Sequence, residues 1–325
     1  MADPISPFLQ QQGVLLLDGG LATELEARGC DLNDPLWSAR VLLEDPDLIR
    51  QVHSDYLQAG ADCIVGASYQ ATIQGFQERG LGAAEATRLL ERSVELAVEA
   101  RDGFWEEPAN RTGRLRPLVG ASVGPYGAYL ADGSEYTGQY GLSTADLRAF
   151  HQSRWEILAE SDADILACET IPSCEEAQVL LALLRETPGA YAWFSFTCRD
   201  GEHLSDGTPL VEMLAALDDE PRIVAVGMNC TSPELAPDLI AVARGVTAKP
   251  IVAYPNSGET YDAAAKCWIG ETSAVDFGRS SERWHALGAR LVGGCCRTGP
   301  GHIRAIRGQL MPPGYLEGMG GGDHA

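Results

Sequence analysis

Residues 223–254 read IVAVGMNCTSPELAPDLIAVARGVTAKPIVAY, and this stretch contains the pattern that decides the fold. Residues 223–229 and 250–254 are continuous runs of mostly apolar residues, which is typical of parallel strands buried on both faces. Between them, Ser232-Pro233 offers a helix start, and a helical pattern continues to Arg244. The stretch therefore predicts a strand, a helix and a second, parallel strand.

The same alternation runs through the whole chain. Apolar runs predict six further strands, at residues 14–18, 62–66, 117–122, 164–168, 191–197 and 290–294. Helical patterns lie between them, at residues 45–60, 83–105, 144–160 and 208–217. Eight strand–helix units predict a single-domain α/β protein, a (β/α)8 TIM barrel, with a doubly wound open sheet as the alternative. No Gly-x-Gly-x-x-Gly follows the first strand, which disfavours the open sheet.

The composition disfavours nucleic-acid-binding, membrane and secreted proteins. The chain has 325 residues with 24 Lys and Arg against 46 Asp and Glu, a formal net charge of −22. We expect no nucleic-acid or membrane partner, because phosphate binding needs clustered basic residues. Apolar stretches such as residues 179–184 are far shorter than the ~18 residues of a spanning helix. The start, MADPISP, lacks the basic and apolar regions of a signal peptide, so the expected location is cytoplasmic.

Three of the nine cysteines follow predicted strands. An odd number of cysteines spread over a long chain disfavours a disulfide framework, so some of these thiols could bind a metal or take part in catalysis. Cys230 follows the sixth strand, and Cys295 and Cys296 follow the eighth. The carboxyl ends of barrel strands form one face, so these thiols are expected to meet there. Three thiolates can hold zinc and leave a fourth position open for a substrate.

Around these cysteines the chain resembles the homocysteine S-methyltransferase family over nearly its whole length. The matching segments are LDGG (17–20), TEL (23–25), GASYQAT (66–72), ETIP (169–172), GMNC (227–230), YPNSG (254–258) and GGCCRT (293–298). One departure is Gly299, where the family usually has a second Thr. Among family members the chain looks closest to the short, single-domain enzymes, and it ends where cobalamin-dependent relatives would continue. We expect the barrel to span residues 1–313 and residues 314–325 to form a flexible tail.

The resemblance implies one Zn²⁺ per chain, held by Cys230, Cys295 and Cys296. It also implies transfer of a methyl group from S-methylmethionine or S-adenosylmethionine to the thiol of homocysteine, giving methionine. An ordinary thiol is mostly protonated at neutral pH, whereas a thiol bound to zinc is deprotonated and nucleophilic. Attack on a sulfonium methyl needs no general base. The partners would then be small molecules, and we expect a monomer, with a dimer as the alternative.

Further candidates for substrate binding lie at the strand ends. Glu169 is placed to hold the amino group of homocysteine, a role that the resemblance also implies, while Asp18 and the N–H groups of Gly19 and Gly20 could fix its other end. The remaining candidates are Ser68 and Asn229 as substrate or supporting contacts, Asn256 at the open zinc position, and Trp37, Tyr69 and Tyr126 as a cation–π wall around the sulfonium.

Each of these residues also has a purely structural interpretation. Asp18 would cap the following helix, Glu169 would pair with an Arg at the rim, Ser68 and Asn229 would bond the backbone, and the aromatic residues would pack as core or lid. Helical patterns place His53, His151 and His285 at the surface or rim, and His302 in a helix-capping contact.

Three other functions remain open from the residues alone. Betaine–homocysteine methyl transfer would use the same zinc site with a quaternary ammonium donor. An acyltransferase or oxidoreductase using Cys295 and Cys296 would be active without metal. A zinc or thiol sensor would bind metal tightly without turnover.

Overall fold

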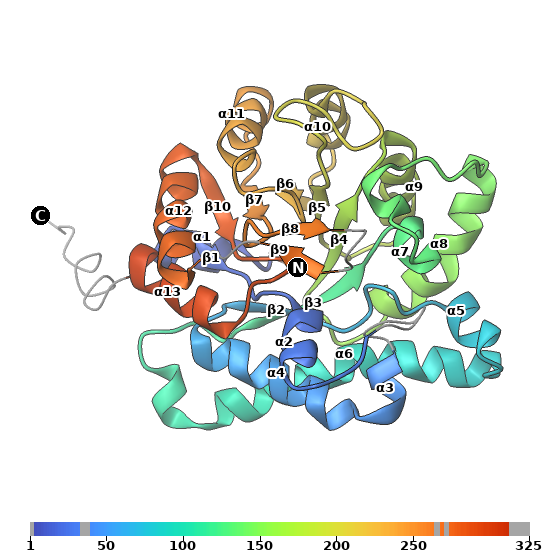
Figure 1. The fold of residues 1–325 in the computed structure, drawn as a ribbon, viewed down its shortest axis with the longest axis horizontal. Helices are drawn as coiled ribbons and strands as arrows, with labels where there is room; N and C mark the ends of the chain where they lie inside the picture. The colour runs from blue at the N-terminus through green and yellow to red at the C-terminus, as the bar shows by residue number, and fades with distance from the viewer. Residues whose placement is uncertain (1–2, 33–39, 263–266, 270–272, 312–325) are drawn as a thin grey trace, which may run out of the picture.

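The computed structural model describes residues 3–32, 40–262, 267–269 and 273–311, and it confirms the TIM barrel (Figure 1). Eight parallel strands pair in the order β1-β10-β7-β6-β5-β4-β3-β2, and a bridge between Leu17 and Cys63 joins β1 to β2. The strands are β1 (Leu15–Leu16), β2 (Cys63–Val65), β3 (Leu118–Val123), β4 (Ile165–Ile171), β5 (Ala192–Phe196), β6 (Ile223–Asn229), β7 (Ile251–Tyr254) and β10 (Ala289–Val292). All eight predicted strands are present.

Helices surround the barrel, as Figure 1 shows. They are α1 (Ser6–Gln12), α2 (Leu21–Ala27), α3 (Val41–Glu44), α4 (Pro46–Ala59), α5 (Ile73–Glu78), α6 (Ala83–Glu106), α7 (Tyr126–Leu130), α8 (Thr144–Ala159), α9 (Cys174–Glu186), α10 (Leu210–Asp218), α11 (Ala236–Val246), α12 (Ala274–Leu287) and α13 (Pro300–Leu310). Short 3₁₀ turns occur at Pro108–Arg111 and Ser134–Tyr136. No described helix is long and apolar enough to cross a membrane.

Helix α4 shows how the local sequence sets the helix ends. The Asp45 side chain accepts a hydrogen bond from the Leu48 N–H at 3.2 Å, and Pro46 occupies the first turn, where its missing N–H costs nothing. Gly60 ends the helix with a φ of 114°, a conformation that favours glycine. The predicted helix over residues 45–60 is therefore confirmed at both ends.

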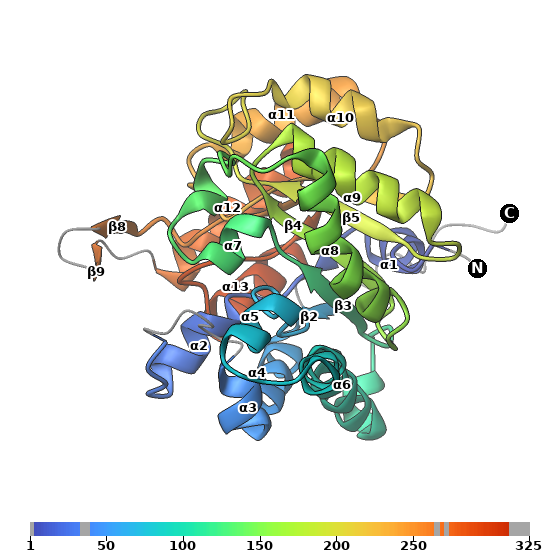
Figure 2. The ribbon, with the colours of Figure 1, turned by 90° about the vertical axis from the view of Figure 1, so that its right-hand side faces the viewer.

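Two apolar layers build the molecule. One lies between the sheet and the outer helices, and the other fills the barrel interior. Ile5 and Phe8, at the start of the chain, pack into the interior layer together with Trp193 and Tyr254. Figure 2 shows α1 at one end of the barrel and α2, α7 and the β8–β9 hairpin (Thr260–Asp262 and Cys267–Ile269) at the other. Helix α1 therefore closes the end opposite to these elements.

The structure differs from the sequence predictions in several places. Helix α11 begins at Ala236 and not at Ser232, because the Leu235 N–H bonds the Ser232 carbonyl in a preceding turn. The β8–β9 hairpin was not predicted. His53 and His151 are buried, so the prediction of a surface or rim position was wrong. Their helices carry these residues on the faces that pack inward. The proposed boundary at residue 313 lies outside the described residues.

Candidate metal centre and active site

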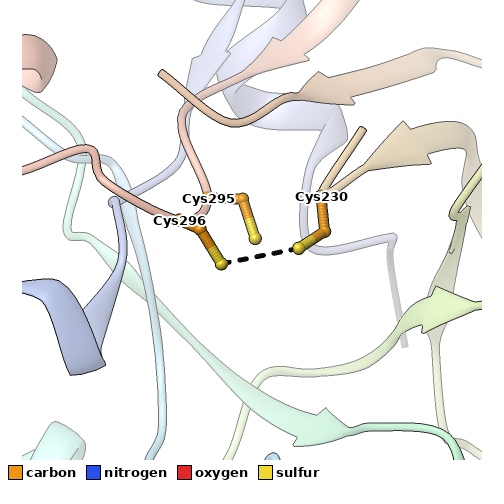
Figure 3. A group of neighbouring side chains, drawn as sticks. All are labelled: Cys230, Cys295 and Cys296. Carbon is orange, nitrogen blue, oxygen red and sulfur yellow. Dashed lines mark hydrogen bonds between the residues drawn. The ribbon is translucent and has the colours of Figure 1, made fainter. Parts of the chain in front are cut away.

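The three predicted cysteines meet at the carboxyl end of the barrel. Cys230 directly follows β6, and Cys295 and Cys296 follow β10. Figure 3 shows their sulfur atoms converging, and the three Sγ atoms lie within 4.8 Å of one another. The Sγ atoms of Cys230 and Cys296 are 3.6 Å apart. A tetrahedral zinc site with Zn–S near ~2.3 Å would place its sulfurs about 3.8 Å apart, so the cluster fits such an ion.

The backbone N–H groups of the three cysteines donate hydrogen bonds to the end of β7 and the loop that follows it. The N–H of Cys295 bonds the Pro255 carbonyl at 2.9 Å, and the N–H of Cys296 bonds Asn256 Oδ1 at 3.1 Å. The N–H of Cys230 bonds the Tyr254 carbonyl at 3.3 Å. Three consecutive residues, the last of β7 and the two that follow it, thus hold the backbone of all three cysteines. Asn256 was predicted at the open metal position, and here its side-chain oxygen supports the backbone of Cys296.

The side chain of Asn229 packs beside the cysteine cluster and hydrogen-bonds the end of β4. Its side chain is fully buried, and its Oδ1 accepts from the Thr170 N–H at 2.7 Å while its Nδ2 donates to Thr170 Oγ1 at 2.8 Å. Nδ2 also lies 3.9 Å from Cys295 Sγ. Asn229 therefore connects the ends of β4 and β6 beside the sulfur cluster.

Two predicted carboxylates lie at the site. Glu169 accepts hydrogen bonds from Ser122 Oγ at 2.5 Å and from the Tyr254 hydroxyl at 3.0 Å, and not from an arginine. Burial raises the pKa of Glu169 to about 7, against the opposing effect of these two donors. Asp18 accepts from the Val65 N–H at 2.8 Å, so it joins β1 to β2 and does not cap α2. Burial raises the pKa of Asp18 well above its usual range, with a further contribution from Glu169.

Other predicted polar contacts are engaged within the protein. Ser68 Oγ donates to the Ser122 carbonyl at 2.8 Å, and the Gly20 N–H donates to the Thr298 carbonyl at 2.9 Å. Gly19 packs tightly, because an added Cβ would lie 2.7 Å from that same carbonyl oxygen. Of the two glycine N–H groups proposed for a substrate carboxylate, the one at Gly20 already has a partner.

The predicted aromatic residues divide between two places. Tyr69 hydrogen-bonds the Thr170 side chain, and burial, followed by the charge of Cys230, raises the pKa of Tyr69. The Tyr126 ring instead packs on Phe150, with ring centroids 4.8 Å apart, and the backbone N–H of Tyr126 donates to Glu176 Oε1. Tyr69 is therefore a neighbour of the cysteine site, whereas Tyr126 anchors α7 onto α8. Trp37 lies outside the described residues.

Sequence reasoning missed two site residues on the segment between β3 and α8. The Tyr136 hydroxyl lies 3.2 Å from Cys230 Sγ. The preceding residue, Glu135, is partly buried, and its pKa is raised to about 7 by burial and by the charge of Cys230. These residues follow no strand end and no helical period, so only the abundance of Gly and Tyr over residues 133–141 could have indicated a structured loop.

The departure at Gly299 has a local cause. Gly299 precedes α13, and a Cβ at this position would overlap the Glu24 carboxylate. Its N–H donates to His302 Nδ1 at 3.1 Å, which confirms the predicted capping contact of His302. The effect of the missing side chain is therefore confined to the start of α13 and its contact with α2.

Comparison with known proteins identifies the family. The homocysteine S-methyltransferase family profile matches residues 15–310. The homocysteine S-methyltransferase YbgG of Bacillus subtilis is 53% identical over 304 residues, covering 94% of this chain and 96% of that protein. Two crystal structures of the homocysteine methyltransferase MmuM from Escherichia coli also match. The oxidized form has a TM-score of 0.86 at 48% identity, covering 95% of this chain and 100% of that one, and the metallated form has 0.84 at 50%, covering 94% and 99%.

The chain belongs to the homocysteine S-methyltransferase family, and it is a methyltransferase with a TIM-barrel fold. Its three cysteines form a site that can hold a metal ion, and the solved metallated relative accords with that.

Proposed function

We propose that this enzyme transfers a methyl group from a sulfonium donor, S-methylmethionine or S-adenosylmethionine, to the thiol of homocysteine and releases methionine. The observation that carries the proposal is the cluster of three sulfur atoms within 4.8 Å beside the Glu169 carboxylate. The family and the names of its relatives support homocysteine as the acceptor.

The proposed metal is zinc, one ion per chain, on Cys230, Cys295 and Cys296. Three thiolates with no histidine or carboxylate form a soft donor set, which suits zinc better than magnesium or calcium. Bound there, zinc would lower the pKa of the acceptor thiol so that it enters the reaction as a thiolate.

The remaining tasks fall to residues of the chain. Glu169 would accept the ammonium group of homocysteine, because its carboxylate is held rigidly by Ser122 and Tyr254. The Gly19 N–H would meet the substrate carboxylate. Tyr69 would contribute an aromatic face for the sulfonium, whose positive charge favours the electron-rich ring. The transfer is an in-line displacement, so the protein contributes mainly by positioning the two sulfurs.

The test combines metal analysis with turnover on the same sample. We expect about one zinc per chain and methionine formation from homocysteine with S-methylmethionine, lost on chelation and restored by zinc. Cys230→Ser, Cys295→Ser and Cys296→Ser should each abolish turnover and reduce bound zinc. Cys174→Ser, at the half-buried start of α9, is the matched control and should retain both.

Several results would contradict the proposal. Turnover in a metal-free sample would favour a cysteine nucleophile. Stoichiometric zinc without turnover on any methyl donor would favour a sensor. Turnover with betaine, but with neither S-methylmethionine nor S-adenosylmethionine, would show that the methyl donor is a quaternary ammonium compound and not a sulfonium compound.

A further inference from the structure

A third carboxylate, besides those of Glu169 and Asp18, lies at the metal site without an assigned role. Glu135 belongs to the 3₁₀ turn Ser134–Tyr136, in the segment that leads from β3 to α8. Its Oε2 atom is buried, and no residue in the described part of the chain donates a hydrogen bond to it. A buried acceptor without a donor is costly, so such an atom marks a place where a ligand can supply one.

The turn that carries Glu135 is fixed in place. The Glu135 carbonyl accepts from Thr197 Oγ1 at 3.1 Å, which ties the turn to the end of β5. Gly127 of α7 packs against the Glu135 backbone so closely that a Cβ there would lie 2.8 Å from the Glu135 Cα. The next residue, Tyr136, places its hydroxyl 3.2 Å from Cys230 Sγ. The backbone of Glu135 is therefore held in a fixed position next to a residue that contacts the sulfur cluster.

The surroundings of Glu135 favour a cation. Its charge interacts with those of the Cys230 and Cys296 thiols, and it also contributes to the raised pKa of Tyr69. The interaction between like charges is unfavourable in the free enzyme, and a positively charged ligand beside Glu135 would relieve it. No described arginine or lysine pairs with this carboxylate.

We infer that Glu135 binds a positively charged group of the methyl donor, either its sulfonium or its ammonium, and so contributes to donor binding. This inference rests on the proposed function, in which Glu169 already serves the acceptor. The acceptor sulfur attacks the methyl carbon and forms the new S–C bond, while the old S–C bond breaks and its electron pair stays on the donor sulfur. The donor thereby loses its sulfonium charge, so its attraction to Glu135 falls after transfer and product release is favoured.

The test uses Glu135→Gln in the zinc-loaded enzyme. We expect the KM for S-methylmethionine to rise about tenfold or more, which is the usual effect of losing a charged hydrogen bond, while the KM for homocysteine and the zinc content change less than twofold. Asp132→Asn is the control, because it removes an exposed charge from the same loop. It should leave both KM values unchanged.

A donor without an amino group tells which cation Glu135 contacts. Dimethylsulfonioacetate has a sulfonium but no ammonium. If Glu135→Gln raises the KM for both donors, the contact is with the sulfonium; if only for S-methylmethionine, it is with the ammonium. A donor KM within twofold of the wild type would overturn the inference. Calorimetric binding of S-methylmethionine without acceptor tests it independently, so absent turnover in the wild type would count against the proposed function alone.

Discussion

Three residues at the sulfur cluster have backbone conformations that residues with side chains rarely adopt. The φ angles are 61° at Thr170, 49° at Cys230 and 64° at Arg297. Each such residue costs about 1–3 kcal/mol and persists only where its surroundings enforce it. Thr170 is the most unfavourable because its side chain is β-branched. The enforcing contacts are the two hydrogen bonds between Asn229 and Thr170 and the bond from the Arg297 N–H to Thr23 Oγ1 at 2.9 Å.

Replacing Asn229 tests whether these contacts organise the metal site. Asn229→Ala leaves the buried Thr170 N–H without its partner, so the free energy of unfolding should fall by about 1–3 kcal/mol. Affinity for zinc should fall too, because Asn229 directly precedes Cys230. The measurements are denaturant unfolding and zinc competition with a chromophoric chelator. Asn110→Ala is the control: it removes a bond to the Phe104 carbonyl on the outer surface and should spare zinc affinity. Unchanged zinc affinity in Asn229→Ala would show that Asn229 stabilises the fold but does not organise the metal site.

Single site residues could be predicted from the sequence where a residue type with a specific chemistry stands at the end of a predicted strand. Cys230, Cys295 and Cys296 could be predicted because soft ligands follow buried strands. Glu135 and Tyr136 could not, since their placement depends on how a long loop folds back onto β5 and α7. The partner of Asp18, the Val65 N–H, was equally hidden because it requires knowledge of strand register.

Among the elements, the contact between β6 and β7 depends on one glycine. A Cβ at Gly227 would overlap the Val252 carbonyl of β7, where the neighbouring atom is backbone and cannot rotate away. We expect Gly227→Ala to displace β6, lower the free energy of unfolding by about 1–3 kcal/mol and reduce zinc binding through Cys230. Gly245→Ala, in α11, is the control. Its Cβ would meet nothing within 4 Å, so it should be neutral or stabilise by about 0.5–1 kcal/mol. Equal stabilities in chemical unfolding would contradict this account.

Helix α4 carries a buried histidine that should make stability depend on pH. Burial lowers the pKa of His53 to about 4, and neither ring nitrogen has a hydrogen-bond partner among the described residues. The unfolded chain takes up this proton near pH 6.5, the folded chain only near pH 4. Stability is therefore full above pH 6.5 and falls by roughly 3 kcal/mol as the pH drops to 4. His53→Leu should remove the contribution of one proton to the pH dependence of the free energy of unfolding between pH 4 and 6.5. An unchanged slope would show that His53 is protonated in the folded state.

The elements themselves were largely predictable, for a physical reason. Strands buried on both faces must be apolar throughout, so runs such as residues 223–229 stand out against the helical periods. The β8–β9 hairpin lacks such a run, because it projects from the body of the barrel and has no second buried face (Figure 2). The start of α11 was misplaced because Ser232-Pro233 is a good signal for a turn as well as for a helix.

For the whole molecule, the two ends of the barrel have separate tasks. Helix α1 closes one end with Ile5 and Phe8, which join the interior apolar layer. The other end gathers the thiols and the carboxylates of Asp18, Glu135 and Glu169, whose raised pKa values reflect burial against the same layer. The end closed by α1 thus contributes apolar packing, while the strained and charged groups lie at the end that carries the thiols.

This division predicts that the metal adds to stability without being needed for folding. Zinc would bind Cys230 at the end of β6 together with Cys295 and Cys296 at the end of β10, and these sites come together only in the folded chain. Ligand at ~100 times its dissociation constant stabilises by about 2.7 kcal/mol, or roughly 4 °C in Tm for a chain of this size. We expect the chelated protein to unfold cooperatively at the lower temperature and added zinc to restore the higher one. Cys296→Ser should show no shift with zinc, and Cys174→Ser the full shift. A chelated protein without a cooperative transition would mean that the barrel itself depends on the metal, and an identical Tm would mean that the cluster holds none.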